Sequence, residues 1–175
     1  MKKCYVVLAC ASLFAACQPK PATETVASSP SPDYPYKIKN PDNWMIDTSH
    51  ANTMTALNAL KAYETKDTVL MKKCIGDSIT FSYDGGVFKG TNAQFVKMAA
   101  TMSTGITTKI KVDDWEAVVG KDVKKHEWVS IWYTQYNTDM KGKKDSVEYL
   151  NDMLIKNGKI IKLDEYARHF KMPGK

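Results

Sequence analysis

The stretch that decides the fold runs from Asp145 to Tyr166 and reads DSVEYLNDMLIKNGKIIKLDEY. Two runs with the periodicity of strands flank Asn157-Gly158. Asn-Gly between such runs is the strongest short hairpin signal, because both residues tolerate a positive φ. The pattern therefore predicts an antiparallel hairpin of two long strands, 145–156 and 159–166.

Earlier in the chain, strand periodicity predicts two more long strands, 106–119 and 127–137. A turn is predicted at Lys141-Gly142-Lys143. Earlier still, apolar residues recur at helical spacing in three segments, and a short hairpin is predicted around Asp84-Gly85-Gly86. The three predicted helices cover about 48–63, 69–75 and 92–104. Helices first and a sheet last predict an α+β fold, with the helices covering one face of a curved antiparallel sheet.

The first seventeen residues have the anatomy of a secretory signal peptide: two lysines, an apolar run and two alanines before Cys17. The apolar run is too short to span a bilayer, which takes ~20 residues. Residues 13–17, LFAAC, resemble a bacterial lipobox, which implies cleavage before Cys17 and a lipid on that cysteine. The expectation is a lipoprotein in the cell envelope of a Gram-negative bacterium, at the outer membrane. An ordinary cleaved signal is the alternative.

Residues 18–43 read as a linker, since six of the seven prolines fall there among serines and threonines. Residues 44–175 are dense in apolar and aromatic residues and are predicted to form one domain. Within that domain Cys74 is the sole cysteine. It cannot form an intramolecular disulfide there, and we expect a buried thiol.

The formal net charge of +6 raises the question of a nucleic-acid partner. Of the 25 basic residues only Arg168 is an arginine, the side chain best suited to forked contacts with phosphates and guanine, so nucleic-acid binding is not predicted. His50, His126 and His169 lack any spacing that preorganises a metal site. Neither a metal nor a cofactor is expected.

Several short motifs together with the order of elements resemble the NTF2-like superfamily, and more closely the SnoaL-like lipoproteins of Bacteroidota. The resemblance covers about Trp44 to Phe170, and its motifs are Asp42–Trp44, Tyr63–Asp67, Asp77–Phe81, Gly90, Glu127–Trp132, Gly142–Ser146, Asn157–Ile161 and Glu165-Tyr166. It implies a sheet wrapped into a cone around three N-terminal helices. It further implies a small apolar ligand in the mouth of the cone and a dimer formed through the outer sheet face.

The best-known chemistry of this fold, ketosteroid isomerisation, is not supported residue by residue. At the position of the family's base the chain has Ser82, and the position of the oxyanion tyrosine corresponds to Ala59. The protonated aspartate corresponds to Asn151, and a register slip of one residue would substitute Asp152. The weak catalytic candidates that remain are Asp152, Asp164 and His169.

Aromatic residues dominate the predicted strands. Strand alternation places Trp128, Trp132 and Tyr136 on one face, and Val129, Ile131 and Tyr133 on the other. Both faces are apolar, so we expect a homodimer through the outer face. Which face lines the pocket stays open.

Two functions follow. The favoured one is a lipid-anchored, non-catalytic binder of a small apolar ligand or a protein partner. The alternative is an isomerase, dehydratase or cyclase that uses a pocket carboxylate. The predicted pocket residues are Tyr63, Phe81, Trp132, Asn151 and Tyr166.

Overall fold

The computed structural model describes residues 33–37, 43–121 and 124–169. The chain divides into two compact units, Met1–Lys39 and Asn40–Lys175. In the first unit the described residues, 33–37, are exposed and form neither helix nor strand. The predicted signal peptide with Cys17, and all of the predicted linker except residues 33–37 and 43, lie outside the described residues.

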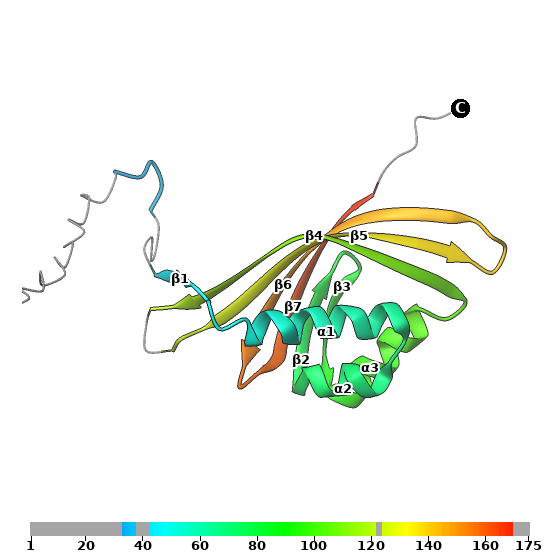
Figure 1. Cartoon of the computed structure of the whole chain (residues 1–175), viewed down its shortest axis with the longest axis horizontal. Coiled ribbons are helices and arrows are strands. Elements are labelled where there is room, and N and C mark those ends of the chain that lie inside the picture. Colours follow the sequence, from blue (N-terminus) through cyan, green and yellow to red (C-terminus); the bar gives the residue numbers. More distant parts are fainter. Residues whose placement is uncertain (1–32, 38–42, 122–123, 170–175) are drawn as a thin grey trace, which may run out of the picture. The chain divides into compact units, whose positions relative to one another are not determined.

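The described part of the second unit holds three helices and seven strands (Figure 1). The helices are α1 (Ala51–Thr65), α2 (Thr68–Cys74) and α3 (Asn92–Met102). The strands are β1 (Trp44–Ile46), β2 (Ile75–Tyr83), β3 (Gly86–Thr91), β4 (Ile106–Gly120), β5 (Glu127–Asp139), β6 (Lys144–Lys156) and β7 (Lys159–His169). The predicted helices and the four predicted long strands are confirmed, whereas β1 was not predicted.

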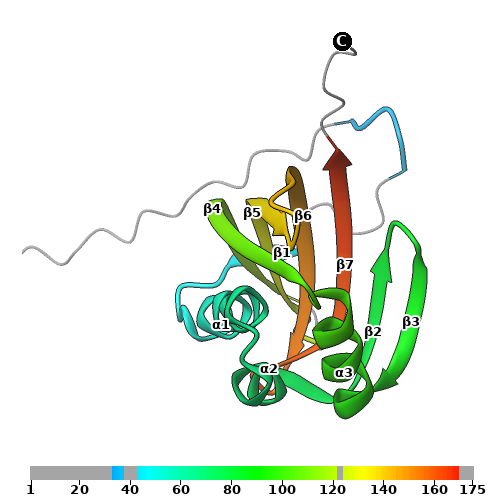
Figure 2. The same ribbon diagram turned by 90° about the vertical axis from the view of Figure 1, so that its right-hand side faces the viewer.

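All seven strands form one sheet in the order β1-β4-β5-β6-β7-β2-β3. The four long strands make the predicted antiparallel meander, and β2 pairs antiparallel with β3. The expected all-antiparallel sheet is corrected at one place, because β2 pairs with β7 in parallel. The helices lie together on one side of the curved sheet (Figure 2). We call the helix side the inner face and the opposite side the outer face.

The helix ends show how local sequence starts each helix. The side chain of Asp67 accepts hydrogen bonds from the backbone N–H groups of Val69 and Leu70 at 3.0 and 2.9 Å, which starts α2. At α3 the side chains of Thr91 and Gln94 form a reciprocal capping box. At α1 the N-cap is His50, in the left-handed region, with no side-chain cap hydrogen bond.

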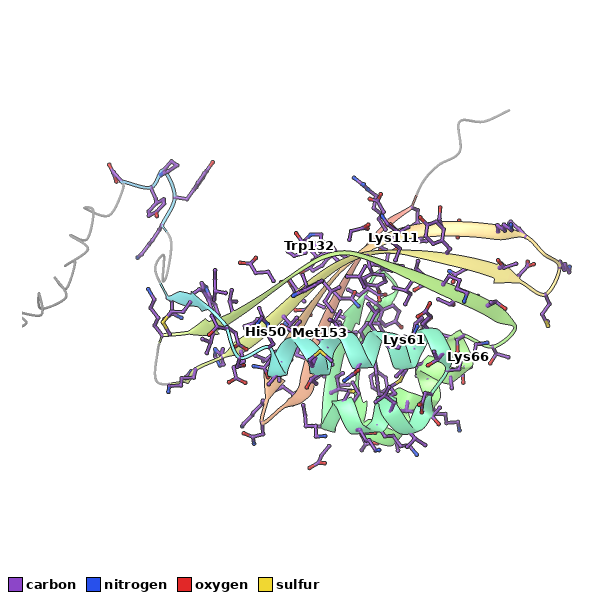
Figure 3. The ribbon with its side chains drawn as sticks, viewed as in Figure 1. His50, Lys61, Lys66, Lys111, Trp132 and Met153 are labelled. Carbon is purple, nitrogen blue, oxygen red and sulfur yellow. The ribbon has the colours of Figure 1, made fainter. Side chains whose placement is uncertain are left out.

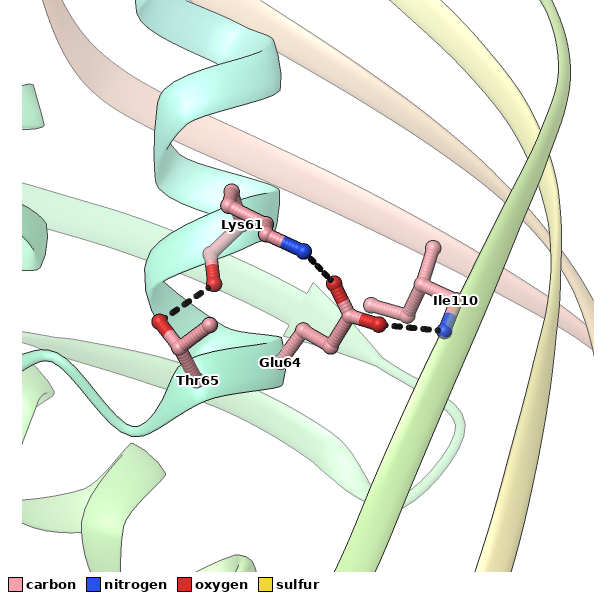
Figure 4. A network of polar contacts seen from close by, with 4 residues as sticks. All are labelled: Lys61, Glu64, Thr65 and Ile110. Carbon is pink, nitrogen blue, oxygen red and sulfur yellow. Dashed lines mark hydrogen bonds and ion pairs between the residues drawn. The ribbon is translucent and has the colours of Figure 1, made fainter.

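The C-terminal turn of α1 is attached to the edge of β4 through Glu64 (Figure 4). One carboxylate oxygen of Glu64 pairs with Lys61 Nζ at 2.6 Å, and the other accepts the backbone N–H of Ile110 at 3.1 Å. Because β1 covers only Val118–Gly120 of β4, no strand of the described chain neighbours Ile110 on that side. Glu64 therefore satisfies a backbone donor that the sheet leaves unpaired. The hydrogen bond from Lys61 is the largest cause that lowers the pKa of Glu64.

The core lies between the helices and the inner face. Val129 and Ile131 are fully buried and Tyr133 is 3 % exposed, whereas Trp132 is 38 % exposed. Figure 3 shows Trp132 on the outer side of the sheet and Met153 on the helix side. The predicted alternation along 128–136 is thus confirmed, and the open question of which face meets the helices is answered.

Cys74 is buried, as predicted, and burial raises the pKa of its thiol. No helix in the described part of the chain combines the length and the apolar character that crossing a membrane requires.

Candidate functional site: an apolar cavity with one carboxylate

A cavity of about 120 Å³ lies between the inner face and the helices. Residues from all three helices and from strands β2, β5, β6 and β7 line it. Most of the lining is aliphatic, aromatic or thioether. The lining residues are Ala59, Leu60, Tyr63, Met71, Ile75, Phe81, Phe95, Met98, Ala99, Met102, Tyr133, Gln135, Tyr149, Asn151, Met153, Ile160, Leu163 and Glu165.

Asn151 and Tyr133 form the polar centre of the cavity wall. Asn151 is 4 % exposed, and its Nδ2 donates to the hydroxyl oxygen of Tyr133 at 3.2 Å. The Asn151 Oδ1 atom is buried and has no hydrogen-bond partner among the described residues. Tyr133 also stacks on Tyr149, with ring centroids 5.2 Å apart and 19° between the planes. An acceptor left without a donor costs on the order of 1–3 kcal/mol, so this arrangement favours a ligand that brings a donor.

Glu165 is the carboxylate of the cavity. It lies on β7 directly opposite Asn151 on β6. Burial raises the pKa of Glu165 to about 7, and no charged partner among the described residues lowers it. The side chain therefore changes its charge near neutral pH.

Three tyrosines surround this carboxylate. Burial, followed by the charge of Glu165, raises the pKa of Tyr63, holds that of Tyr133 well above 10, and raises that of Tyr149 to about 12. All three stay neutral around pH 7 and offer hydroxyl donors rather than charges.

The structure brings three of the five predicted pocket residues, Tyr63, Phe81 and Asn151, into the cavity lining. Their role in binding stays a prediction. Trp132 and Tyr166 are placed elsewhere, on the outer face, where Tyr166 is 59 % exposed. The predicted location of these two residues is therefore corrected.

A β-bulge explains the position of Tyr166. The register shifts between Leu154 and Ile155 of β6, so that Ile155 pairs with Ile160 while Leu154 pairs with Lys162. Ile160 is buried, so regular alternation along β7 would place Lys162, Asp164 and Tyr166 on the inner face as well. The extra residue, Ile161, inverts that phase, because one inserted residue changes the face of every later side chain. Leu163 and Glu165 therefore face the cavity.

The weak catalytic candidates lie outside the cavity lining. Asp152 accepts a hydrogen bond from Ser130 Oγ at 2.5 Å, on the face opposite Asn151. Asp164 forms an ion pair with Lys162, and His169 is exposed. The alternative register that would substitute Asp152 for Asn151 is excluded, since Asn151 is the residue in the lining. Sequence reasoning missed Glu165 as a site residue, because the bulge that turns its side chain inward leaves no clear mark in a sequence.

The positions that correspond to the oxyanion tyrosine and the base of ketosteroid isomerases are Ala59 and Ser82, and the structure shows where each lies relative to the cavity. Ala59 lines the cavity, and Ser82 does not. Tyr63, one helical turn after Ala59, supplies a phenol from α1 instead. Within the described residues, no group of three or more His, Cys, Asp or Glu side chains is placed to hold a metal ion.

Neither a family model nor a curated protein matches this sequence. Solved structures do match. An LEH-like epoxide hydrolase from Mycobacterium tuberculosis is 12% identical, with a TM-score of 0.56 over 70% of this chain and 86% of that chain. An NTF2-like protein of unknown function from Burkholderia pseudomallei is 13% identical, with a TM-score of 0.54 over 66% and 89%.

A candidate polyketide cyclase from Xanthomonas campestris is 14% identical, with a TM-score of 0.54 over 69% of this chain and 92% of that chain. At such identities the likeness shows the fold alone. The fold is the NTF2-like α+β cone, an unclosed mixed sheet of long strands curved around three helices.

Proposed function

We propose that this domain binds a small, largely apolar molecule inside the cone. The observation that carries the proposal is an apolar cavity whose lining holds a single carboxylate, Glu165. The cavity volume of about 120 Å³ sets the scale. An engineered apolar cavity of ~150 Å³ binds benzene, so the enclosed part of the ligand is about the size of one ring. Met102 of the lining is 49 % exposed, which puts it at the rim where a longer ligand would emerge.

Native mass spectrometry of residues 18–175 tests this proposal. We expect an extra mass that is retained under mild conditions and lost on unfolding. Ala59→Leu places additional methyl groups in the cavity and should lower the occupancy. Ala51→Leu makes the same change at an exposed position of the same helix, outside the cavity lining, and should leave it unchanged. Equal occupancy in both variants would place the ligand elsewhere.

A second candidate function is proton transfer without a cofactor, as in an isomerase, dehydratase or cyclase. It is supported by the pKa of about 7 of Glu165, because a general base works best when its pKa lies near the working pH. The neutral hydroxyls of Tyr63, Tyr133 and Tyr149 could stabilise a developing oxyanion. An epoxide hydrolase and a candidate polyketide cyclase have the same fold, which is therefore compatible with catalysis.

Hydrogen exchange at carbon distinguishes a binder from such an enzyme. The ligand recovered from the protein is incubated with it in D₂O, and loss of C–H signals is followed by NMR. An enzyme exchanges protons, and Glu165→Gln abolishes this exchange even at ligand concentrations that saturate the variant. A pure binder leaves the C–H signals intact.

We further propose that the chain belongs among the SnoaL-like lipoproteins of Bacteroidota and is anchored at the outer membrane by a lipid on Cys17. The supporting observation is the lipobox-like segment 13–17. Metabolic labelling with a radioactive fatty acid should mark the wild-type chain and fail to mark Cys17→Ser. Label retained in the variant would refute a lipid at that cysteine.

For the outer face we propose a homodimer interface. Trp132, Tyr136 and Tyr166 are 38, 47 and 59 % exposed there, and large apolar side chains gathered on one face mark interaction surfaces. Trp132→Glu should convert a dimer of residues 18–175 into a folded monomer in analytical ultracentrifugation. A wild-type chain that sediments as a monomer at tens of micromolar would contradict the proposal.

A further inference from the structure

The charges inside the cavity differ from those of the chain as a whole. The chain carries 25 Lys and Arg against 19 Asp and Glu. The described residues that line the cavity include no lysine, arginine or histidine, and the one carboxylic acid among them is Glu165. When Glu165 is ionised, the cavity therefore holds a net negative charge that no cationic side chain of the described lining balances.

Asn151 supplies a second group in the cavity that can accept a hydrogen bond from a ligand. Its Oδ1 atom is buried without a partner, and its side chain lies on the same face as Glu165, directly across the strand pair. One of the two N–H bonds of its amide donates to Tyr133. A carboxylate and an amide oxygen thus lie side by side, and the amide oxygen has no hydrogen-bond partner among the described residues. A group with several N–H bonds and a positive charge would satisfy both.

The walls around these acceptors suit a cation as well. Tyr133 and Tyr149 stack on one side, and Tyr63 and Phe81 line the cavity from α1 and β2. Aromatic faces carry partial negative charge and attract an ammonium group by ~0.5–2 kcal/mol, more when water is excluded. The methionine thioethers of the lining are polarisable and accommodate an apolar body of varied shape.

We propose that the ligand of the cone is a small organic amine in its protonated form, with the ammonium group between Glu165 and Asn151 and a single-ring or short alkyl body among the apolar walls. The proposal rests on the proposed binding function and specifies its ligand class. A primary ammonium fits better than a quaternary one, because only N–H bonds can satisfy Asn151 Oδ1.

Three probes with the same number of heavy atoms test this proposal: benzylamine, benzyl alcohol and ethylbenzene. Isothermal titration calorimetry on residues 18–175 at about pH 8 compares a charged donor, a neutral donor and a body without a donor. We expect benzylamine to bind at least tenfold more tightly than benzyl alcohol. Glu165→Gln should weaken benzylamine binding at least tenfold and leave ethylbenzene binding unchanged. Glu116→Gln, at an exposed carboxylate of β4 outside the cavity lining, should change neither.

The pH dependence gives a second readout that does not rely on a variant. The titratable groups that face Glu165 are Tyr63 of α1, Tyr133 of β5 and Tyr149 of β6, and their pKa values are all raised above 10. Between about pH 5 and 8 only Glu165 among them changes charge. Benzylamine affinity should therefore fall toward tenfold for each pH unit below 7, while ethylbenzene affinity stays flat.

The outcomes separate the two proposals. If benzyl alcohol or ethylbenzene binds as tightly as benzylamine, the cone binds small molecules and the preference for a cation is refuted. If no probe binds, the proposed binding function and the preference for a cation are both refuted. If benzylamine binds best but with the same affinity in Glu165→Gln and at every pH, the assigned position of the ammonium group is wrong.

Discussion

Replacing Glu165 by glutamine is expected to stabilise the empty domain at alkaline pH. Burial raises the pKa of this carboxyl from 4.5 to about 7 in the folded chain. Because the folded state then holds its proton more tightly than the unfolded state, the proton contributes stability that is fully present below 4.5. That contribution is lost as the pH rises through about 7. At about 1.4 kcal/mol per pKa unit, the loss amounts to about 3 kcal/mol.

Glutamine keeps the shape of the protonated acid and does not ionise. The difference in unfolding free energy between Glu165→Gln and wild type should thus be near zero at about pH 4.5 and reach about 3 kcal/mol in favour of the variant at about pH 8.5. The facing tyrosines, Tyr63, Tyr133 and Tyr149, stay neutral over this range because their pKa values are raised above 10.

Urea unfolding of residues 18–175, followed by circular dichroism at several pH values, measures this difference. Glu116→Gln is the matched control, since its carboxylate is exposed, and exposed substitutions change stability by about 0.5 kcal/mol or less. A difference between Glu165→Gln and wild type that does not vary with pH would refute the reasoning, as would a wild type more stable than the variant at about pH 8.5.

Three further predictions concern the fold, each measured by urea unfolding. Thr91→Ala removes half of the capping box of α3 and should cost ~1 kcal/mol; an unchanged midpoint would mean that this cap contributes nothing. Gly158→Ala should cost ~1–2 kcal/mol from conformation alone, because φ is +69° and, apart from the residue itself and its two chain neighbours, no described heavy atom lies within 4 Å of the new methyl group. Ile131→Ala, at a fully buried position, should cost ~2–5 kcal/mol, whereas Ile46→Ala on β1, 74 % exposed, should stay within ~0.5 kcal/mol. Comparable losses for the two isoleucine variants would contradict the assigned core.

Most helices and strands could be predicted from the sequence, because the patterns that define them lie within a few neighbouring residues. Alternation over a dozen residues defines each long strand, and Asn157 and Gly158 both adopt the positive φ that the turn requires. Strand β1 was not predicted, because its three residues are all exposed and show no alternation. The parallel pairing of β2 with β7 joins distant parts of the chain, and no pattern within either strand encodes it.

The candidate site was harder to predict because it depends on which side each strand presents. In β5 the alternation of side chains is unbroken from Val129 onward. The position of Tyr133 on the same face as Val129 could therefore be predicted from the sequence. In β7, the bulge at Ile161 reverses the phase, which sent Tyr166 outward and Glu165 inward. A bulge of one residue leaves no clear mark in a sequence, and the carboxylate of the cavity was missed for that reason.

The parallel pairing of β2 and β7 has a consequence for how the chain acquires its site. Thr80 pairs with Lys162, which follows it by 82 residues, so this contact closes a long loop and belongs among the slow steps of folding. The last strand also supplies Leu163 and Glu165 to the cavity wall. A chain still being synthesised, or one cut before residue 159, lacks both the strand that joins β6 to β2 and the carboxylate. Competence to bind would then appear in one step, when the last strand is added.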